Sequence, residues 1–117
     1  MARHSLSGAV DFSVLERMTA GDDSVSEEVL GLFVEQAALW TPMLHPKAEG
    51  WRDAVHTVRG TAAGVGARAL ADACLEAEQA PPDVASAKLD HVRDALDAAL
   101  ADVAAYRHEL MLRSLRG

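Results

Sequence analysis

Apolar side chains recur at alternating steps of three and four residues through most of the chain. The pattern is longest near the end, where it comprises Leu89, Val92, Leu96, Ala99, Val103, Tyr106 and Leu110. This spacing places the apolar residues on one face of an α-helix. No segment combines alternating apolar and polar residues with the β-branched enrichment of a strand. The chain is therefore expected to be all-α.

Two serine and glutamate pairs predict where the first two helices begin. Residues 13–16 and 24–27 both read Ser-x-x-Glu, the signature of a capping box. Gly21 would end the first, short helix. The second is expected to end near Thr41, because a proline follows it. Its inner stripe is predicted to consist of Val25, Val29, Leu32, Phe33, Gln36, Trp40 and Met43.

Three more helices are expected after the turn at residues 45–50. One runs from Trp51 to the glycines at 64–66, and the next covers residues 68–80. The last and longest follows the break Pro81-Pro82-Asp83, with Asp83 as its predicted cap. Short connections between amphipathic helices favour antiparallel neighbours. We therefore predict an antiparallel up-down four-helix bundle with a short additional N-terminal helix.

Length and composition limit the domain organisation and the functional class. The 117 residues suit a single domain, predicted over residues 11–117, with residues 1–10 as a loose N-terminal arm. The net charge of -7 argues against a nucleic-acid partner. No apolar run is long enough to span a membrane, and residues 1–10 lack the apolar stretch of a secretory signal, so a cytoplasmic location is expected. The single cysteine, Cys74, lies in a helical pattern and is expected to be a packed thiol.

His56 lies beside the apolar row of the third predicted helix and outside it. That row contains Trp51, Val55, Val58, Ala62 and Val65. His56 is about 100° around the helix from Val55, at the edge of the exposed face. Its helical neighbours are one cation and three small residues: Arg59, Gly60, Ala63 and Gly64. We expect Gly60, Ala63 and Gly64 to form a docking face for another protein, together with Val34 and Ala38 of the second helix.

Glycine inside a helix is unfavourable by about 0.5 to 1 kcal/mol relative to alanine, so Gly60 and Gly64 need a reason. Close access of a partner's backbone to His56 is the reason that we favour. The alternative is that the glycines let a neighbouring helix of the same chain pack closely.

Glu78 is expected to face His56 across the hairpin formed by the third and fourth helices. The two residues are almost equally distant from the turn at residues 64–67, so they lie at one level of the bundle. A neutral imidazole attacks through one nitrogen while the other carries the proton, and a carboxylate bonded to that N–H fixes the tautomer. Glu78 as a solvated surface residue remains the alternative.

The segment His56-Thr-Val-Arg59-Gly60, with Gly66 and Glu78 after it, resembles the histidine-containing phosphotransfer (HPt) family. That family has His-x-x-Lys-Gly, a second glycine ten residues after the histidine, and Gln or Glu twenty-two residues after it. Residues 11–22 and 30–33 resemble its first two helices. The chain departs from the family at Arg59, where lysine is usual, and in its short connection from residue 44 to residue 51.

The resemblance implies a phosphorelay protein that carries a phosphoryl group on His56, with Arg59 and Glu78 assisting. The expected partner is a receiver domain of a response regulator or hybrid histidine kinase, whose bound Mg²⁺ and lysine complete the chemistry. The protein itself would have no ATP site and no cofactor, would not be an enzyme in its own right, and would be a monomer.

Other site chemistries find less support in the sequence. A di-iron bundle needs paired Glu-x-x-His motifs, and the nearest match is a single Asp53-x-x-His56, so no metal site is predicted. The glycines at 60–66 lack the Lys-Ser/Thr of a phosphate-binding loop. Two alternatives stay open: a helical adaptor that binds a receiver or kinase without being phosphorylated, and a bundle that dimerises through its last helix.

Overall fold

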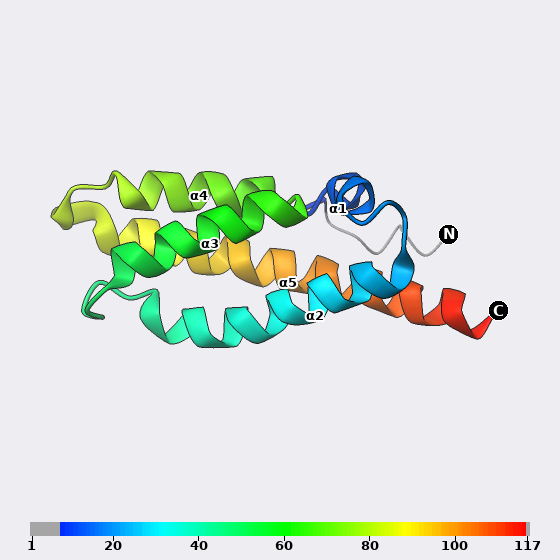
Figure 1. The fold of residues 1–117 in the computed structure, drawn as a ribbon. Helices are drawn as coiled ribbons and strands as arrows, with labels where there is room; N and C mark the ends of the chain where they lie inside the picture. Colours follow the sequence, from blue (N-terminus) through cyan, green and yellow to red (C-terminus); the bar gives the residue numbers. More distant parts are fainter. Residues whose placement is uncertain (1–7, 117) are drawn as a thin grey trace.

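The computed structural model describes residues 8–116, which form five α-helices and two short 3₁₀ helices (Figure 1). The α-helices are α1 (Phe12–Met18), α2 (Asp23–Trp40), α3 (Trp51–Val65), α4 (Arg68–Glu78) and α5 (Ala85–Leu115). The 3₁₀ helices are η2 (Thr41–Met43) and η3 (Pro82–Val84). These residues include no strand, so the predicted all-α class is confirmed. None of their helices has both the length and the apolar composition of a membrane span.

Each helix from α2 to α5 runs in the opposite direction to the one before it, and together they form an elongated bundle (Figure 1). The molecule measures 53 × 23 × 21 Å. Helix α3 contacts α2 and α4, and α5 contacts the same two helices from the other side of the core. Helix α5 extends along the whole bundle, while α1 lies across the end where α3 meets α4 (Figure 1). The predicted up-down bundle with a short N-terminal helix is confirmed.

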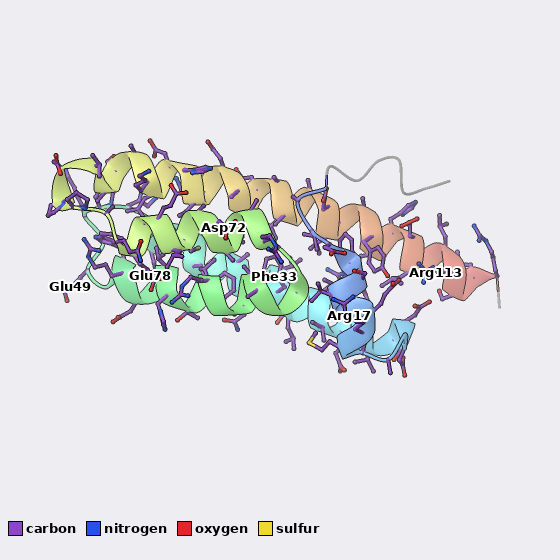
Figure 2. All side chains as sticks on the ribbon, turned by 90° about the horizontal axis from the view of Figure 1, so that it is seen from above. Arg17, Phe33, Glu49, Asp72, Glu78 and Arg113 are labelled. Carbon is purple, nitrogen blue, oxygen red and sulfur yellow. The ribbon has the colours of Figure 1, made fainter. Side chains whose placement is uncertain are left out.

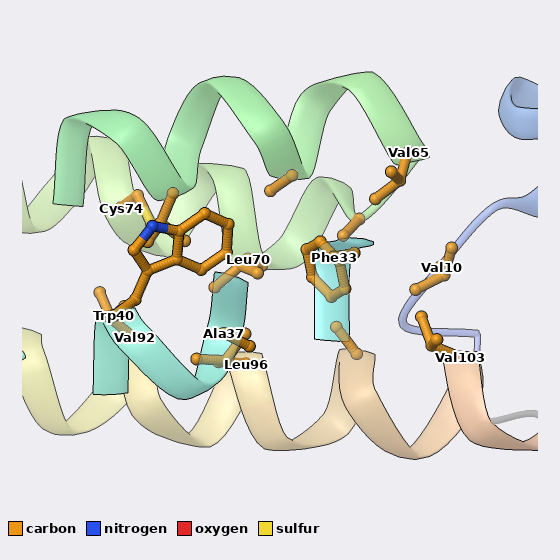
Figure 3. Packing of buried hydrophobic residues seen from close by; sticks show 14 of the residues in the cluster. Val10, Phe33, Ala37, Trp40, Val65, Leu70, Cys74, Val92, Leu96 and Val103 are labelled. Atoms are coloured by element: carbon orange, nitrogen blue, oxygen red, sulfur yellow. The ribbon is translucent and has the colours of Figure 1, made fainter. Parts of the chain in front are cut away.

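The buried rows of α3 and α5 match their predicted apolar patterns, but the row of α2 matches only at Phe33 and Trp40. Helix α2 buries Ser26, Leu30, Phe33, Ala37 and Trp40, of which Phe33, Ala37 and Trp40 are labelled in Figure 3. Leu32 and Gln36 are exposed. Phe33 and Trp40 are buried as predicted, while the other buried positions each follow a predicted residue by one, so the buried face is rotated by less than the roughly 100° of one residue. Apolar residues occupy two adjacent faces of this helix, so periodicity alone did not separate them. The buried Ser26 hydroxyl lies 2.9 Å from that of Thr19, which satisfies its hydrogen bonding.

Aspartates, and not the predicted serines, cap the first two helices. Asp11 accepts the backbone N–H of Ser13, and Asp22 accepts those of Ser24 and Val25. Aspartate is as good an N-cap as serine, and here it lies two residues earlier in both segments. The predicted cap Asp83 is also wrong, because it lies within η3 and α5 begins at Ala85 without a side-chain cap.

Val10 and Asp11, which directly precede α1, are anchored to the bundle. The N–H of Val10 donates to the buried Asp102 carboxylate at 3.2 Å, and that of Asp11 donates to the Gly66 carbonyl at 2.8 Å. The Phe12 ring stacks on Tyr106, with 4.1 Å between centroids. Residues 1–7 of the predicted arm lie outside the described residues. Val10 is only 5% exposed, so the packed domain begins before Asp11, the predicted boundary.

Candidate functional site

Helix α3 presents His56 to solvent, as its sequence predicted. The row formed by Val55, Val58, Ala62 and Val65 is buried in the core. The His56 side chain, one residue away from that row, is 67% exposed. The imidazole is therefore held on a rigid helix and remains open to another molecule.

Glu78, the last residue of α4, lies against His56. Its Oε1 atom is 2.7 Å from the Nδ1 atom of His56, across the α3–α4 hairpin. Gly66 ends α3 with a φ of 89°, a left-handed conformation that allows the chain to reverse direction there. The predicted proximity of the two residues is present in the structure.

The contact with Glu78 determines which nitrogen of His56 is free. An ionised carboxylate can only accept hydrogen bonds, so the bonded Nδ1 must carry a proton. In the neutral ring the Nε2 atom then holds an unshared electron pair. Glu78 thus selects the tautomer in which the nucleophilic nitrogen is the one away from α4.

Arg59 completes the cluster by binding the second oxygen of Glu78. Its Nε atom lies 2.5 Å from Oε2. Its Nη2 atom is 3.3 Å from the Nδ1 atom of His56, a close approach that is not a hydrogen bond while Nδ1 carries the proton directed at Glu78. The predicted cation therefore lies beside the histidine and holds the same carboxylate.

The environment of Glu78 keeps it ionised. Burial raises the pKa of its carboxyl group. Hydrogen bonds from His56 and Arg59, together with the charge of Arg59, lower the pKa by a larger amount, so the net pKa is below its ordinary value. The side chain is 18% exposed, which limits competition from water for these bonds. Figure 2 shows Glu78 toward the end of the bundle that carries Glu49, far from Arg113.

The glycines near His56 face open space. A Cβ atom built on Gly60 or Gly64 would meet no atom within 4 Å, apart from neighbouring residues and the backbone of the same helix. Among the described residues, no neighbouring helix packs against them, so close packing within the chain does not explain these glycines. Ala63 is exposed as well. Because these three residues have little or no side chain, no bulky group blocks access to the imidazole from this side.

Helical geometry places the predicted docking residues Val34 and Ala38 on the flank of α2 that borders α5. They continue the row of Glu27 and Gly31 at steps of three and four. Glu27 binds Arg107 of α5 at 2.7 Å, and a Cβ on Gly31 would lie 3.6 Å from the same guanidinium. The structure therefore does not bring Val34 and Ala38 together with the His56 face.

Helix α2 contacts α3 as well as α5, so its opposite flank borders α3; this flank is mainly apolar and also carries the exposed Gln36. Val25, Leu32 and Leu39 recur there at intervals of seven residues. Leu32 and Leu39 are 55% and 67% exposed. Leu32, predicted to lie in the core, is instead part of this exposed surface.

Arg52 is a residue near the site that the sequence analysis missed. It lies one helical turn before His56, and its Nη1 atom donates to the backbone carbonyl of Glu78 at 2.7 Å. The signals were its spacing from His56 and the Pro81-Pro82 pair, which leaves the end of α4 short of backbone donors.

Other reactive side chains are remote from the cluster or inert. Within residues 8–116, no three His, Cys, Asp or Glu side chains are grouped so that they could hold a metal ion. Burial raises the pKa of the Cys74 thiol to about 12, which keeps it protonated. The prediction of a packed thiol is confirmed.

Comparisons with known proteins agree with this geometry. The family model described as Hpt domain matches residues 28–104, a span that contains His56, Arg59 and Glu78. The chain is similar to the solved structure of histidine phosphotransferase ShpA from Caulobacter crescentus, with 57% sequence identity and a TM-score of 0.82. That similarity covers 92% of this chain and 99% of the other. A search of curated proteins gave no significant match.

Proposed function

This chain belongs to the Hpt domain family and is a histidine phosphotransfer protein of a phosphorelay, and we propose that His56 carries its phosphoryl group. One observation supports this choice of residue above the others. The exposed His56 ring has its Nδ1 atom 2.7 Å from the Glu78 carboxylate, which leaves Nε2 as the nucleophile.

Phosphoryl transfer at this site would proceed by direct displacement. The electron pair of Nε2 attacks the phosphorus of an aspartyl phosphate on a receiver domain. The bond from phosphorus to the aspartate oxygen breaks as the N–P bond forms, and the aspartate carboxylate leaves. Nδ1 keeps its proton, so the phosphorylated ring is cationic and is stabilised by Glu78. Transfer to a second receiver reverses these steps.

Arg59 has two roles in this proposal. Its Nε bond to Glu78 fixes the carboxylate, and its charge, close to the ring, offsets the negative charge of the phosphoryl group. Phosphoryl transfer depends largely on positioning and electrostatic stabilisation. The receiver would supply its aspartate, a bound Mg²⁺ and a lysine, so this chain needs no cofactor and no ATP site of its own.

The proposed docking face surrounds the imidazole. Gly60, Ala63 and Gly64 allow a receiver to approach the ring closely. On α2, the position of His56 on the neighbouring helix favours the flank with Leu32 and Leu39 over the originally predicted Val34 and Ala38. We propose a monomer that acts in the cytoplasm and carries phosphate between receivers.

A labelling experiment tests the phosphoacceptor. The parent, His56→Gln and His91→Gln would each be incubated with a panel of receiver domains carrying labelled aspartyl phosphate. His91 is exposed on α5 and is the matched control. Acid-labile label should appear on the parent and on the control, and not on His56→Gln, while all three keep the same helical circular dichroism. Label that persists on folded His56→Gln would contradict the proposal.

A further inference from the structure

The end of α4 lacks local donors for its backbone. In a continuing helix, the carbonyl of Glu78 would accept the N–H of residue 82, or that of residue 81 in a tighter turn. Both positions are proline and have no N–H to give. The last residue of a helix is prone to fraying, and here that residue carries the carboxylate that orients His56.

Arg52 supplies the missing donors from α3. Its Nη1 atom donates to the carbonyl of Glu78 at 2.7 Å, and its Nη2 atom donates to that of Ala80 at 3.1 Å. The planar guanidinium thus spans two carbonyls on either side of the helix end. Its positive charge also lies at the negative end of the α4 dipole.

The Arg52 side chain is itself held in place. Its guanidinium carbon lies 4.3 Å from the centroid of the Trp51 ring, a cation–π distance. Trp51 in turn packs against the hydrophobic core. The donor that holds the end of α4 is therefore supported by the bundle.

Three side chains of α3 together define the position of Glu78. Arg52 holds its backbone carbonyl, His56 bonds Oε1, and Arg59 bonds Oε2. A carboxylate held by its side chain alone would follow any movement of the frayed helix end. With the backbone also held, the carboxylate stays at the height of the imidazole.

We propose that Arg52 is a positioning residue for phosphoryl transfer, which acts by holding the Glu78 backbone so that its carboxylate keeps His56 in the Nδ1–H tautomer. The inference rests on the proposed function, because it assigns a purpose to that tautomer. Arg52 acts through Glu78 and does not bind the phosphoryl group.

The test compares Arg52→Met, Arg52→Lys and the control Arg116→Met with the parent. Arg116 is exposed at the far end of α5, so its replacement removes the same charge away from the site. Ring ¹⁵N shifts of unphosphorylated protein report the His56 tautomer. Amide exchange of Gln79 and Ala80, which donate to carbonyls of α4, reports fraying. Transfer from a phosphorylated receiver gives the rate.

In Arg52→Met we expect less Nδ1–H tautomer, faster exchange of both amides and a transfer rate lower by about threefold to tenfold. Arg52→Lys keeps the charge but has a single nitrogen in place of the two that bind the carbonyls, so it should be intermediate, while Arg116→Met should match the parent. If Arg52→Met misfolds by circular dichroism, Arg52→Lys decides by the same readouts. Parental tautomer and amide exchange in a folded variant would overturn the inference, even if transfer slowed. If the parent accepts no phosphoryl group, the proposed function fails. The tautomer and amide-exchange measurements do not depend on transfer, so they still test whether Arg52 positions Glu78.

Discussion

His56, Arg59 and Glu78 depend on one another at the scale of single residues. The carboxylate has two oxygens and uses one for each partner, at 2.7 Å and 2.5 Å. A histidine on an exposed helical face would otherwise exchange freely between its two neutral tautomers. The chemistry proposed for Nε2 therefore depends on a residue twenty-two positions later in the chain.

Replacing Glu78 should slow transfer in proportion to the hydrogen bonds lost. Glu78→Leu removes both acceptors, and a hydrogen bond to a charged group contributes about 1.5 to 3 kcal/mol, so transfer should fall by roughly tenfold to a hundredfold. Glu78→Gln keeps one acceptor oxygen and can still bind one of the two partners, so transfer should fall less than in Glu78→Leu. Rates from single-turnover labelling measure both. Parental transfer by a folded Leu variant would show that another group or water orients His56.

The lowered pKa of Glu78 predicts how stability depends on pH. Its folded pKa lies below its ordinary value of 4.5, so its contribution to stability is present above that value and is lost as pH falls through the folded pKa. Urea unfolding at a series of pH values below 5 should show a steeper loss of stability for the parent than for Glu78→Gln. Equal slopes in the two proteins would contradict the assigned pKa direction.

At the scale of helices, two glycines at the C-terminal end of α3 have different roles. Gly64 has a helical conformation and open space around it. Gly66 has a φ of +89°, and a Cβ there would lie 2.3 Å from the carbonyl oxygen of Asp11. The second glycine of the motif is thus required by the turn and by the segment that leads into α1. Gly64 has no such structural requirement.

Substitutions at these two glycines should have opposite effects. Gly64→Gln should raise the free energy of unfolding, or leave it unchanged, through a helix propensity gain of about 0.5 to 1 kcal/mol. It should also reduce transfer, because a long side chain would obstruct the receiver. Gly66→Ala should lower the free energy of unfolding by more than about 1 kcal/mol. Urea denaturation and transfer rates check both, and normal transfer by Gly64→Gln would place the docking face elsewhere.

The two flanks of α2 should respond differently to a new charge. Leu32→Glu lies on the flank that borders α3 and should weaken binding to a receiver. Val34→Glu lies on the flank that borders α5 and should have a smaller effect, although both side chains are at least partly exposed, at 55% and 36%. Calorimetric titration with a receiver domain compares them. A larger effect of Val34→Glu would restore the original prediction for this helix.

For the whole molecule, the proposed chemistry and the anchoring of the N-terminal segment lie in different parts of the bundle. His56 and Glu78 lie where α3 begins and α4 ends, whereas α1 packs where α3 ends and α4 begins (Figure 1). The buried Asp102 of α5 accepts the Val10 N–H, and Phe12 stacks on Tyr106 beside it. Stability and phosphoryl transfer should therefore be separable by mutation.

Asp102→Ala tests this separation. Loss of the carboxylate leaves the Val10 N–H without this acceptor, and an unsatisfied buried donor is unfavourable by about 1 to 3 kcal/mol. The free energy of unfolding in urea should fall by that order. The transfer rate of the folded fraction, measured well below the unfolding midpoint, should stay at the parental value. A loss of transfer without a loss of stability would show that the two regions are coupled.

The sequence by itself determined the helical class, the bundle topology and the exposure of His56, because these follow from local periodicity and turn residues. The sequence also predicted that His56 and Glu78 lie opposite each other, since an antiparallel hairpin pairs residues that are equally distant from its turn. Tertiary packing decided which of two apolar faces of α2 is buried, because both satisfy the helical period. The capping aspartates act on N–H groups two or three residues later, so they are local features that the Ser-x-x-Glu pattern obscured. The contact of Arg52 with Glu78 was decided by tertiary packing, because it depends on which groups meet in space and cannot be read from spacing along one helix.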